Sequence, residues 1–136
     1  MKELDVVIKG KRIHNKDHMD LAEVQAIPKI GWTLPANKYY TIVMVDPDAP
    51  SHKDPSNKHW LHWMVVNNNQ TRAMFNAPNP PAGTGEHRYF IYLFEQQKEI
   101  NVPDFNAKRP KFPLETFMKT YGLKPIASTM FTTERN

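Results

Sequence analysis

Four polar side chains lie within or at the ends of apolar segments, where their chemistry could combine. Asp46 follows the apolar run 40–45, His62 lies between two tryptophans, and His87 and Tyr89 begin a third aromatic segment. Imidazole N–H and phenol O–H groups are donors that can converge on a negatively charged group. A carboxylate that accepts from an imidazole fixes its tautomer and favours its protonated form. These residues predict one small anion-binding pocket.

The surroundings of these side chains fit the same prediction. Because side chains alternate along a strand, Trp60, His62 and Met64 are expected on one face and Trp63 on the other. Trp60 and nearby prolines would exclude water from the pocket. In "PPAGTGEHRY" at 80–89, two glycines permit a tight loop whose backbone N–H groups can approach an anion.

Each residue also has a structural interpretation. A single His in a strand is commonly a hydrogen-bonded structural residue, tryptophans commonly fill the core, and Asp46 and Asp48 could only cap a turn. Asp46, His62 and His87 could instead form a metal triad, but neither HxH nor HExxH spacing is present. Ser51 lies near Asp46 without the GxSxG elbow of a hydrolase. We therefore expect a binding protein, with no catalytic residue, metal or cofactor.

Length and composition limit the architecture and the compartment. The 136 residues predict a single domain over 1–136. The absence of cysteine excludes disulfide scaffolds and fits the reducing cytoplasm, which is the expected location. The first residues lack the apolar core of a signal peptide, and no apolar run approaches a membrane span. A soluble protein with at most peripheral membrane contact is expected.

The charge balance favours anionic partners in general but does not indicate nucleic acid. Eighteen Lys and Arg residues against 14 Asp and Glu give a net charge of +4. The basic residues are scattered, and only "KRPK" at 108–111 is clustered. We interpret this cluster as part of a solvated face.

The pattern of apolar residues predicts a mostly β protein. Three segments rich in aromatic and β-branched residues, 39–45, 59–67 and 88–95, should form the centre of a sheet that is buried on both faces. Weaker strand candidates are 4–10, 29–34, which looks like an edge strand, and 126–133.

One helix is predicted late in the chain, and one long connection is expected to carry function. Leu114, Phe117, Met118 and Tyr121 have helical spacing, Pro113 suits the first helical position, and Gly122 suits the stop. The connection 68–87 has turn-forming residues throughout.

Three blocks in fixed order resemble the phosphatidylethanolamine-binding protein (PEBP) family, which includes the Raf kinase inhibitor proteins and plant flowering regulators. They are "DPDAPS" at 46–51, "KHWLHWMVVN" at 58–67 and "PPAGTGEHRY" at 80–89. The resemblance implies an antiparallel β-sandwich of a larger central sheet and a smaller sheet, here with a short helix near residues 113–121. It also implies a cis peptide at Ala49–Pro50 and a second near Lys58–His59.

The resemblance further implies a ligand pocket and its lining. The matching positions, with Gly83 of the glycine loop added, are Asp46, Pro50, Trp60, His62, Pro80, Pro81, Gly83, His87 and Tyr89. Asp48 and Arg88 are expected to pair and to support the pocket from behind. The implied ligands are phosphate, phosphoethanolamine and phosphorylated side chains. Asn57 stands where relatives commonly have an aromatic residue, and the domain is expected to be shortened at the N-terminus and to lack the usual C-terminal helix.

The function expected from this resemblance is non-enzymatic binding of phosphate-bearing ligands, such as the phosphatidylethanolamine headgroup, that regulates a signalling partner such as a kinase. The alternative is a scaffold that inhibits a kinase or protease and whose pocket is vestigial. A metal-dependent enzyme is a third and weaker interpretation. The sequence does not indicate which partner protein would be bound.

Overall fold

The computed structural model describes residues 1–32 and 37–136, which form strands, one α-helix and one 3-10 helix. The strands are β1 (Lys2–Glu3), β2 (Val6–Ile8), β3 (Lys11–Ile13), β4 (Asp17–His18), β5 (Lys29–Ile30), β6 (Tyr39–Asp46), β7 (Trp60–Val66), β8 (Gln70–Ala73), β9 (His87–Gln96) and β10 (Lys124–Thr133). The helices are η1 (Leu21–Val24) and α1 (Leu114–Tyr121). None of the helices in the described residues is long and apolar enough to cross a membrane.

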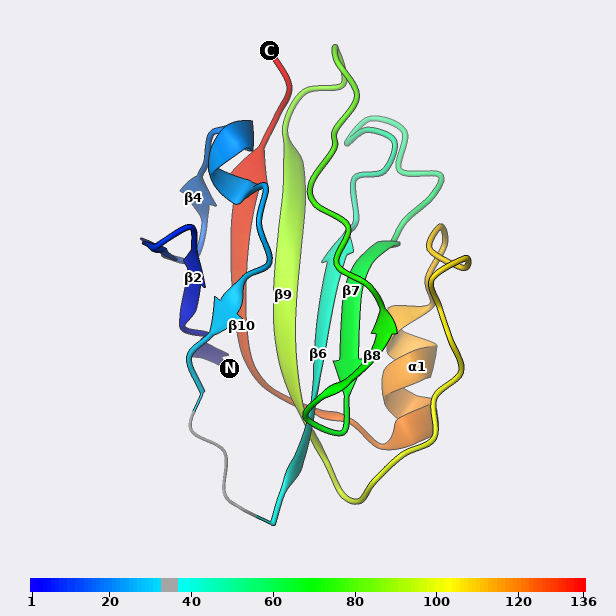
Figure 1. Ribbon diagram of the computed structural model, residues 1–136. Helices are drawn as coiled ribbons and strands as arrows, with labels where there is room; N and C mark the ends of the chain where they lie inside the picture. Colours follow the sequence, from blue (N-terminus) through cyan, green and yellow to red (C-terminus); the bar gives the residue numbers. More distant parts are fainter. Residues whose placement is uncertain (33–36) are drawn as a thin grey trace.

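A seven-stranded sheet forms the centre of the molecule (Figure 1). Its strands run in the order β1-β10-β9-β6-β7-β8, and β4 also pairs with β10. The pairs from β10 to β8 are antiparallel, as predicted, but β1 and β4 both run parallel to β10. The sheet is therefore mixed rather than antiparallel, because the N-terminal segment crosses over before it pairs with the last strand.

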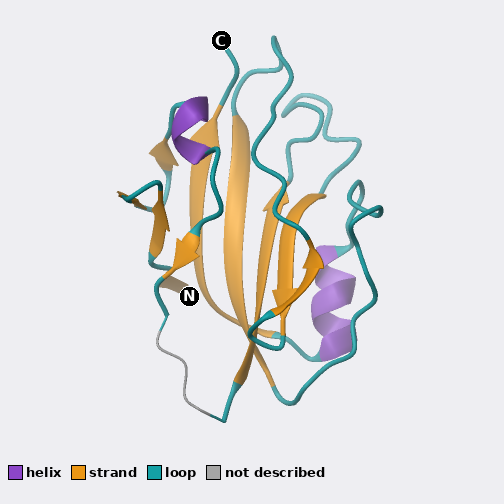
Figure 2. Ribbon diagram, viewed as in Figure 1, coloured by secondary structure: helices purple, strands orange, loops and turns teal. Residues whose placement is uncertain are grey.

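The large sheet is covered on both faces, which explains its continuous apolar strands. A three-stranded sheet, β3-β2-β5, lies on one side, and α1 lies on the other (Figure 2). One apolar cluster, which we call the inner core, joins the two sheets through residues such as Val6, Tyr89 and Phe131. A second, the outer core, packs α1 against the large sheet through residues such as Phe94 and Phe117.

The three central strands were predicted almost to the residue. The candidates 4–10 and 126–133 correspond to β2 and β10, whereas 29–34 contains only the two-residue strand β5 and ends at residues outside the described part. Strands β1, β3, β4 and β8 were not predicted. They have two to four residues each, too few for a periodic pattern, and their pairing depends on the strands beside them.

The predicted helix is present, with one difference at its start. Pro113 occupies the N-cap position with φ −84° and ψ 77°, one residue before its predicted place. Gly122 ends the helix in the left-handed conformation, and the backbone N–H at this cap donates to the carbonyls of Lys119 and Met118. The buried residues Leu114 and Phe117 anchor the helix to the outer core.

Candidate anion-binding cavity

Two loops, 47–59 and 74–86, rise from the same end of the large sheet, which is also the end where the chain terminates (Figure 1). Between them lies a cavity of about 280 Å³. Its lining consists of Asp46, Ala49, Pro50, Asn57, Trp60, His62, Asn76, Ala77, Asn79, Pro80, Pro81, His87 and Tyr89. Eight of the nine predicted ligand residues are therefore brought together.

Gly83 is the exception. It lines a neighbouring, open depression of about 640 Å³ together with Asp48 and Arg88. Gly83 and Gly85 have φ values of 80° and 77°, so they shape the turn that precedes His87. Both glycines line this depression and neither lines the cavity, so they contribute the shape of the turn rather than a contact to the ligand space.

A β-bulge in β7 decides which way His62 points. Met44 pairs with Trp63 and Val45 with Leu61, so His62 is an extra residue on its strand. Trp63 belongs to the inner core, and the His62 ring lies edge-on to Tyr89 of the same core, with centroids 5.2 Å apart. The prediction that Trp63 faces away from His62, and that Met64 shares its face, is therefore wrong. The bulge shifts the alternation by one residue after His62.

The tautomer of His62 is fixed by the backbone. The ring Nδ1 lies 2.6 Å from the carbonyl oxygen of Asn76, so Nδ1 carries the hydrogen and donates it. Burial lowers the pKa of His62 to about 4, despite that hydrogen bond. Near neutral pH, Nε2 is therefore a lone-pair acceptor, not the donor that the sequence suggested.

Asp46 and His87 form a buried pair at the floor of the cavity. The carboxylate Oδ2 lies 2.8 Å from Nδ1 of His87, and Oδ1 accepts the N–H of Asp48 at 2.7 Å. Burial raises the pKa of Asp46, although the hydrogen bonds from His87 and Asp48 oppose this. The other ring nitrogen of His87 is 2.9 Å from the Thr84 hydroxyl, which itself donates to the Pro81 carbonyl. His87 Nε2 therefore donates to Thr84, and one further proton is shared between Asp46 and Nδ1.

Tyr89 supplies the phenol of the site. Its side chain is buried, and its ring stacks on Phe131 with centroids 5.4 Å apart. Burial raises the pKa of Tyr89, so the hydroxyl keeps its proton at any physiological pH. Its hydroxyl makes no hydrogen bond to a residue in the described part of the chain and is available to a ligand in the cavity.

The predicted pair of Asp48 and Arg88 is confirmed. Asp48 accepts the backbone N–H, Nε and Nη2 of Arg88, each at 2.9 Å, and His52 Nδ1 lies 3.0 Å from Oδ1. Burial opposes the ionisation of Asp48, but these hydrogen bonds outweigh it and lower its pKa to about 2. Since the Asp48 N–H also binds Asp46, the pair joins the loop 47–59 to the start of β9 behind the cavity.

Several contributing residues were missed by sequence reasoning. Asn76 and Asn79 line the cavity from a connection that was predicted only in general terms to be functional. Arg109, in the supposed solvated cluster, donates to the carbonyls of Leu61, His62 and Met74 at 2.8–3.2 Å. It therefore holds the strand that carries His62, and local sequence held no signal for contacts that span 35 to 48 residues.

The structure also bears on the expected cis peptide bonds and on the interpretation of the site as a metal triad. The peptide bonds Ala49–Pro50 and Lys58–His59 are both cis, as the resemblance implied. The metal-triad interpretation of Asp46, His62 and His87 is not supported, because one ring nitrogen of His62 and both of His87 are already hydrogen-bonded within the protein.

Comparisons with known proteins agree with the fold. The sequence profile of the phosphatidylethanolamine-binding protein family matches residues 5–72 and 66–131. A phosphatidylethanolamine-binding protein homolog, R644, of Acanthamoeba polyphaga mimivirus is 41% identical, and the alignment covers 98% of each chain. A 26 kDa secreted antigen of Toxocara canis is 35% identical over 81% of this chain, which spans only 47% of that relative.

Among solved structures, the carboxypeptidase Y inhibitor in complex with its cognate proteinase has a TM-score of 0.82 at 20% identity, covering 98% of this chain and 83% of that one. This likeness concerns the fold. The expected cytoplasmic location stays a prediction, since one relative is named as a secreted protein. The family profile and the viral relative together show that the chain belongs to the phosphatidylethanolamine-binding protein family.

Proposed function

We propose that this protein binds, without transforming it, a small phosphate-bearing ligand in the cavity between the loops 47–59 and 74–86. The observation that carries the proposal is the convergence of the Tyr89 hydroxyl, the His62 Nε2 and the Asp46–His87 pair on one space with apolar walls. Among the described residues, its lining includes no serine, threonine or cysteine that could act as a nucleophile.

The size of the cavity sets the kind of ligand. Sites for drug-sized molecules measure about 300–1,000 Å³, and this cavity of about 280 Å³ lies at the lower limit. A phosphate group with a short substituent, such as phosphoethanolamine or the end of a phosphorylated side chain, suits this volume. The acyl chains of a phospholipid would remain outside.

The protonation of the lining selects one form of the phosphate. A neutral His62 offers a lone pair, whereas the Tyr89 hydroxyl offers a hydrogen. A phosphate monoanion presents both a P–OH donor and acceptor oxygens, so it complements this lining better than the dianion does. The Asp46–His87 pair, which holds one shared proton and no net charge, does not repel it.

Positive charge at the mouth favours the same ligand. Arg135 donates to the Pro80 carbonyl at 3.1 Å and to Asn79 Oδ1 at 2.6 Å, and both of these residues line the cavity. Trp60, Pro50 and Pro81 form apolar walls that reduce the competition from water. Hydrogen bonds to a charged group are stronger where water is excluded.

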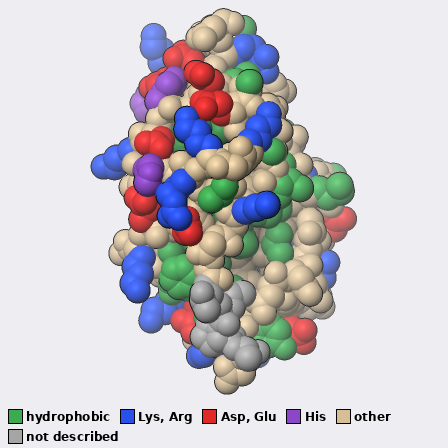
Figure 3. All heavy atoms as spheres, turned by 60° about the vertical axis from the view of Figure 1, so that its left-hand side comes forward, with side chains coloured by type: hydrophobic (Ala, Val, Ile, Leu, Met, Phe, Trp, Pro, Cys, Tyr) green, Lys and Arg blue, Asp and Glu red, His purple; other side chains and the backbone are tan. Residues whose placement is uncertain are grey.

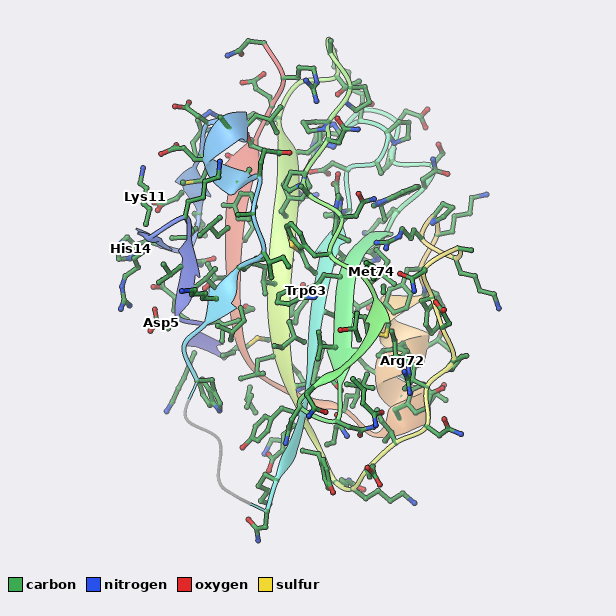
Figure 4. All side chains as sticks on the ribbon, in the orientation of Figure 1. Asp5, Lys11, His14, Trp63, Arg72 and Met74 are labelled. Atoms are coloured by element: carbon green, nitrogen blue, oxygen red, sulfur yellow. The ribbon has the colours of Figure 1, made fainter. Side chains whose placement is uncertain are left out.

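The test is an NMR titration of the intact chain with inorganic phosphate, O-phosphorylethanolamine and phosphotyrosine. We expect the indole signal of Trp60 to shift and saturate, and the signal of Trp63, which lies in the inner core (Figure 4), to stay in place. Ethanolamine and tyrosine, which lack the phosphate, should produce no shift. The three phosphate ligands distinguish a headgroup from a free anion and from a phosphorylated side chain.

A matched pair of variants tests the role of the phenol. Tyr89→Phe should weaken phosphate binding about tenfold or more, because a hydrogen bond to a charged group contributes about 1.5–3 kcal/mol. Tyr92→Phe changes a half-buried tyrosine that stacks with Phe90 and Phe94 on the same strand and should leave binding unchanged. A Trp60 signal that does not move, or a Tyr89→Phe variant that binds like wild type, would overturn the proposal.

Regulation of a kinase or protease partner stays a prediction. An Asp46→Ala, His87→Ala double variant that remains folded separates the two original interpretations once a partner is in hand. Loss of partner binding would favour a functional cavity, and retained binding would favour a scaffold with a vestigial one.

A further inference from the structure

Three potential metal ligands meet on the surface, outside the cavity. His18 lies at the end of β4, Glu86 directly precedes β9, and Glu134 directly follows β10. Their ligand atoms all lie within 4.8 Å of one another, and we call them the rim cluster. Figure 3, which brings the small-sheet side forward, shows acidic and histidine side chains gathered at its upper end.

The sheet register holds the rim cluster in place. Thr132 of β10 pairs with His18 of β4 on one side, and the next residue, Thr133, pairs with His87 of β9 on the other. Continued by one residue, this register brings Glu134 beside Glu86. The three side chains are thus delivered by three adjacent strands and not by one flexible loop.

Among the residues that the structure describes, the Glu134 carboxylate of the rim cluster has no hydrogen-bond or ion-pair partner. His18 Nδ1 lies 2.7 Å from Glu86 Oε1, and the Thr132 hydroxyl lies 3.0 Å from the same nitrogen. Like charges that face each other across a strand pair are destabilising, and Glu134 adds a second carboxylate here. The adjacent Arg135 does not neutralise it, because its guanidinium binds the lip of the cavity. A cation would relieve this repulsion.

The donor types indicate which cation fits. Zinc binds imidazole nitrogen and carboxylate oxygen at about 2.0–2.2 Å in a tetrahedron, which places ligand atoms about 3.3 Å apart. In the rim cluster, His18 Nδ1 and Glu86 Oε1 lie 2.7 Å apart and all ligand atoms lie within 4.8 Å of one another, so the tetrahedral spacing falls inside this range. Calcium prefers six to eight oxygen ligands and would make no use of the imidazole.

We propose that His18, Glu86 and Glu134 form a binding site for one divalent transition-metal ion of the zinc type, with solvent completing its coordination. This site lies apart from the anion cavity, and its existence does not depend on the proposed function. Three other His–carboxylate contacts, His14–Glu3, His52–Asp48 and His87–Asp46, are present in the described residues. In the part of the chain that the structure describes, only the rim cluster places side-chain ligand atoms of one histidine and two carboxylates within 4.8 Å of one another.

The experiment is isothermal titration calorimetry of the full, tag-free chain with Zn²⁺ in a phosphate-free buffer that does not bind metals. We expect one ion per chain. His18→Asn and Glu134→Gln should each weaken Zn²⁺ binding by at least about tenfold, since even the loss of a group that only supports a ligand costs about 10–100-fold in affinity. Titration with Co²⁺ should give the intense visible bands of a four-coordinate site in wild type and not in these variants.

A matched control uses His14, which lies on the outer side of the small sheet (Figure 4). Its ring nitrogen Nδ1 lies 3.8 Å from Glu3, and the Asp17 carboxylate near it accepts the His14 backbone N–H at 2.8 Å. His14→Asn should leave Zn²⁺ affinity unchanged. All three variants alter exposed or half-exposed side chains, so their melting temperatures without metal should stay close to wild type, and Zn²⁺ should raise the melting temperature only where the site is intact. Absence of stoichiometric binding to wild type, or wild-type affinity in His18→Asn, would overturn the proposal.

Discussion

The ion pair behind the cavity gives the sharpest quantitative prediction, the cost of replacing Asp48 by Asn. The buried carboxylate accepts three hydrogen bonds from Arg88 and one contact from His52. An amide of the same shape keeps one acceptor oxygen but places an NH₂ group against the Nη2 donor of Arg88. The substitution therefore removes a charge and creates a conflict between two donors while it leaves the volume unchanged.

The size of the effect follows from the pKa of Asp48. Its lowering from 3.8 to about 2 corresponds to about 2.5 kcal/mol of stabilisation by the ionised form, at about 1.4 kcal/mol for each tenfold change in the ionisation constant. The Arg88 side chain is 40% exposed, so water can solvate the guanidinium and the conflict of donors adds only a little to this. We expect Asp48→Asn to lower the free energy of unfolding by about 3 kcal/mol and the melting temperature by about 10 °C.

The assay is urea denaturation at pH 7, followed by tryptophan fluorescence. Asp54→Asn is the matched control, because Asp54 lies exposed on the same loop and its carboxylate makes no hydrogen bond to a described residue. It should change the free energy of unfolding by less than about 0.5 kcal/mol. An Asp48→Asn value equal to that of the control would refute the bracing role.

The difference in stability between wild type and Asp48→Asn should also depend on pH, in a direction that the pKa of Asp48 determines. The pKa of Asp48 is lower in the folded than in the unfolded chain, so its stabilisation is fully present above about pH 4 and is lost as the pH falls through about 2. The difference between wild type and Asp48→Asn should narrow over this interval and stay constant from about pH 5 to pH 8. A difference that grows on acidification would contradict the assignment.

Three further predictions concern the strand and the floor of the cavity. Arg109→Met should lower the free energy of unfolding by about 2–3 kcal/mol, because three carbonyls lose a charged donor, whereas Lys108→Met should leave it unchanged. Equal urea midpoints for the two variants would show that Arg109 is only a solvated residue. Affinity for O-phosphorylethanolamine should fall as pH rises from about 5.5 to 8.5, because a phosphate monoester loses its second proton near pH 6 while His62 stays neutral throughout. An affinity that calorimetry finds constant over this pH range would refute the preference for the monoanion. Asp46→Asn should place the lone pair of His87 on Nδ1, since Nε2 still donates to Thr84; ¹⁵N chemical shifts of the ring that match wild type would contradict the shared proton.

The residues of the site were predictable to a large extent because they are coded locally. Asp46, His62, His87 and Tyr89 all stand at or near the ends of strands whose apolar pattern is readable, and the resemblance supplied the prolines. The face of the sheet on which the Trp63 side chain lies was not predictable. The alternation of side chains along a strand gives no indication of a bulge that exists only in the pairing with β6. The protonation of His62 depended in the same way on a carbonyl 14 residues away.

The sequence by itself determined the central strands, the helix and the polar side chains that line the cavity, because each follows from neighbouring residues and their periodicity. The tertiary structure alone decided three features: that Gly83 lines a neighbouring depression instead of the cavity, that Arg109 binds three backbone carbonyls, and that His18 meets two glutamates. The physical reason is the same in each case. Such contacts join residues far apart in the chain, and their geometry is set by sheet register and loop packing rather than by local residue preference.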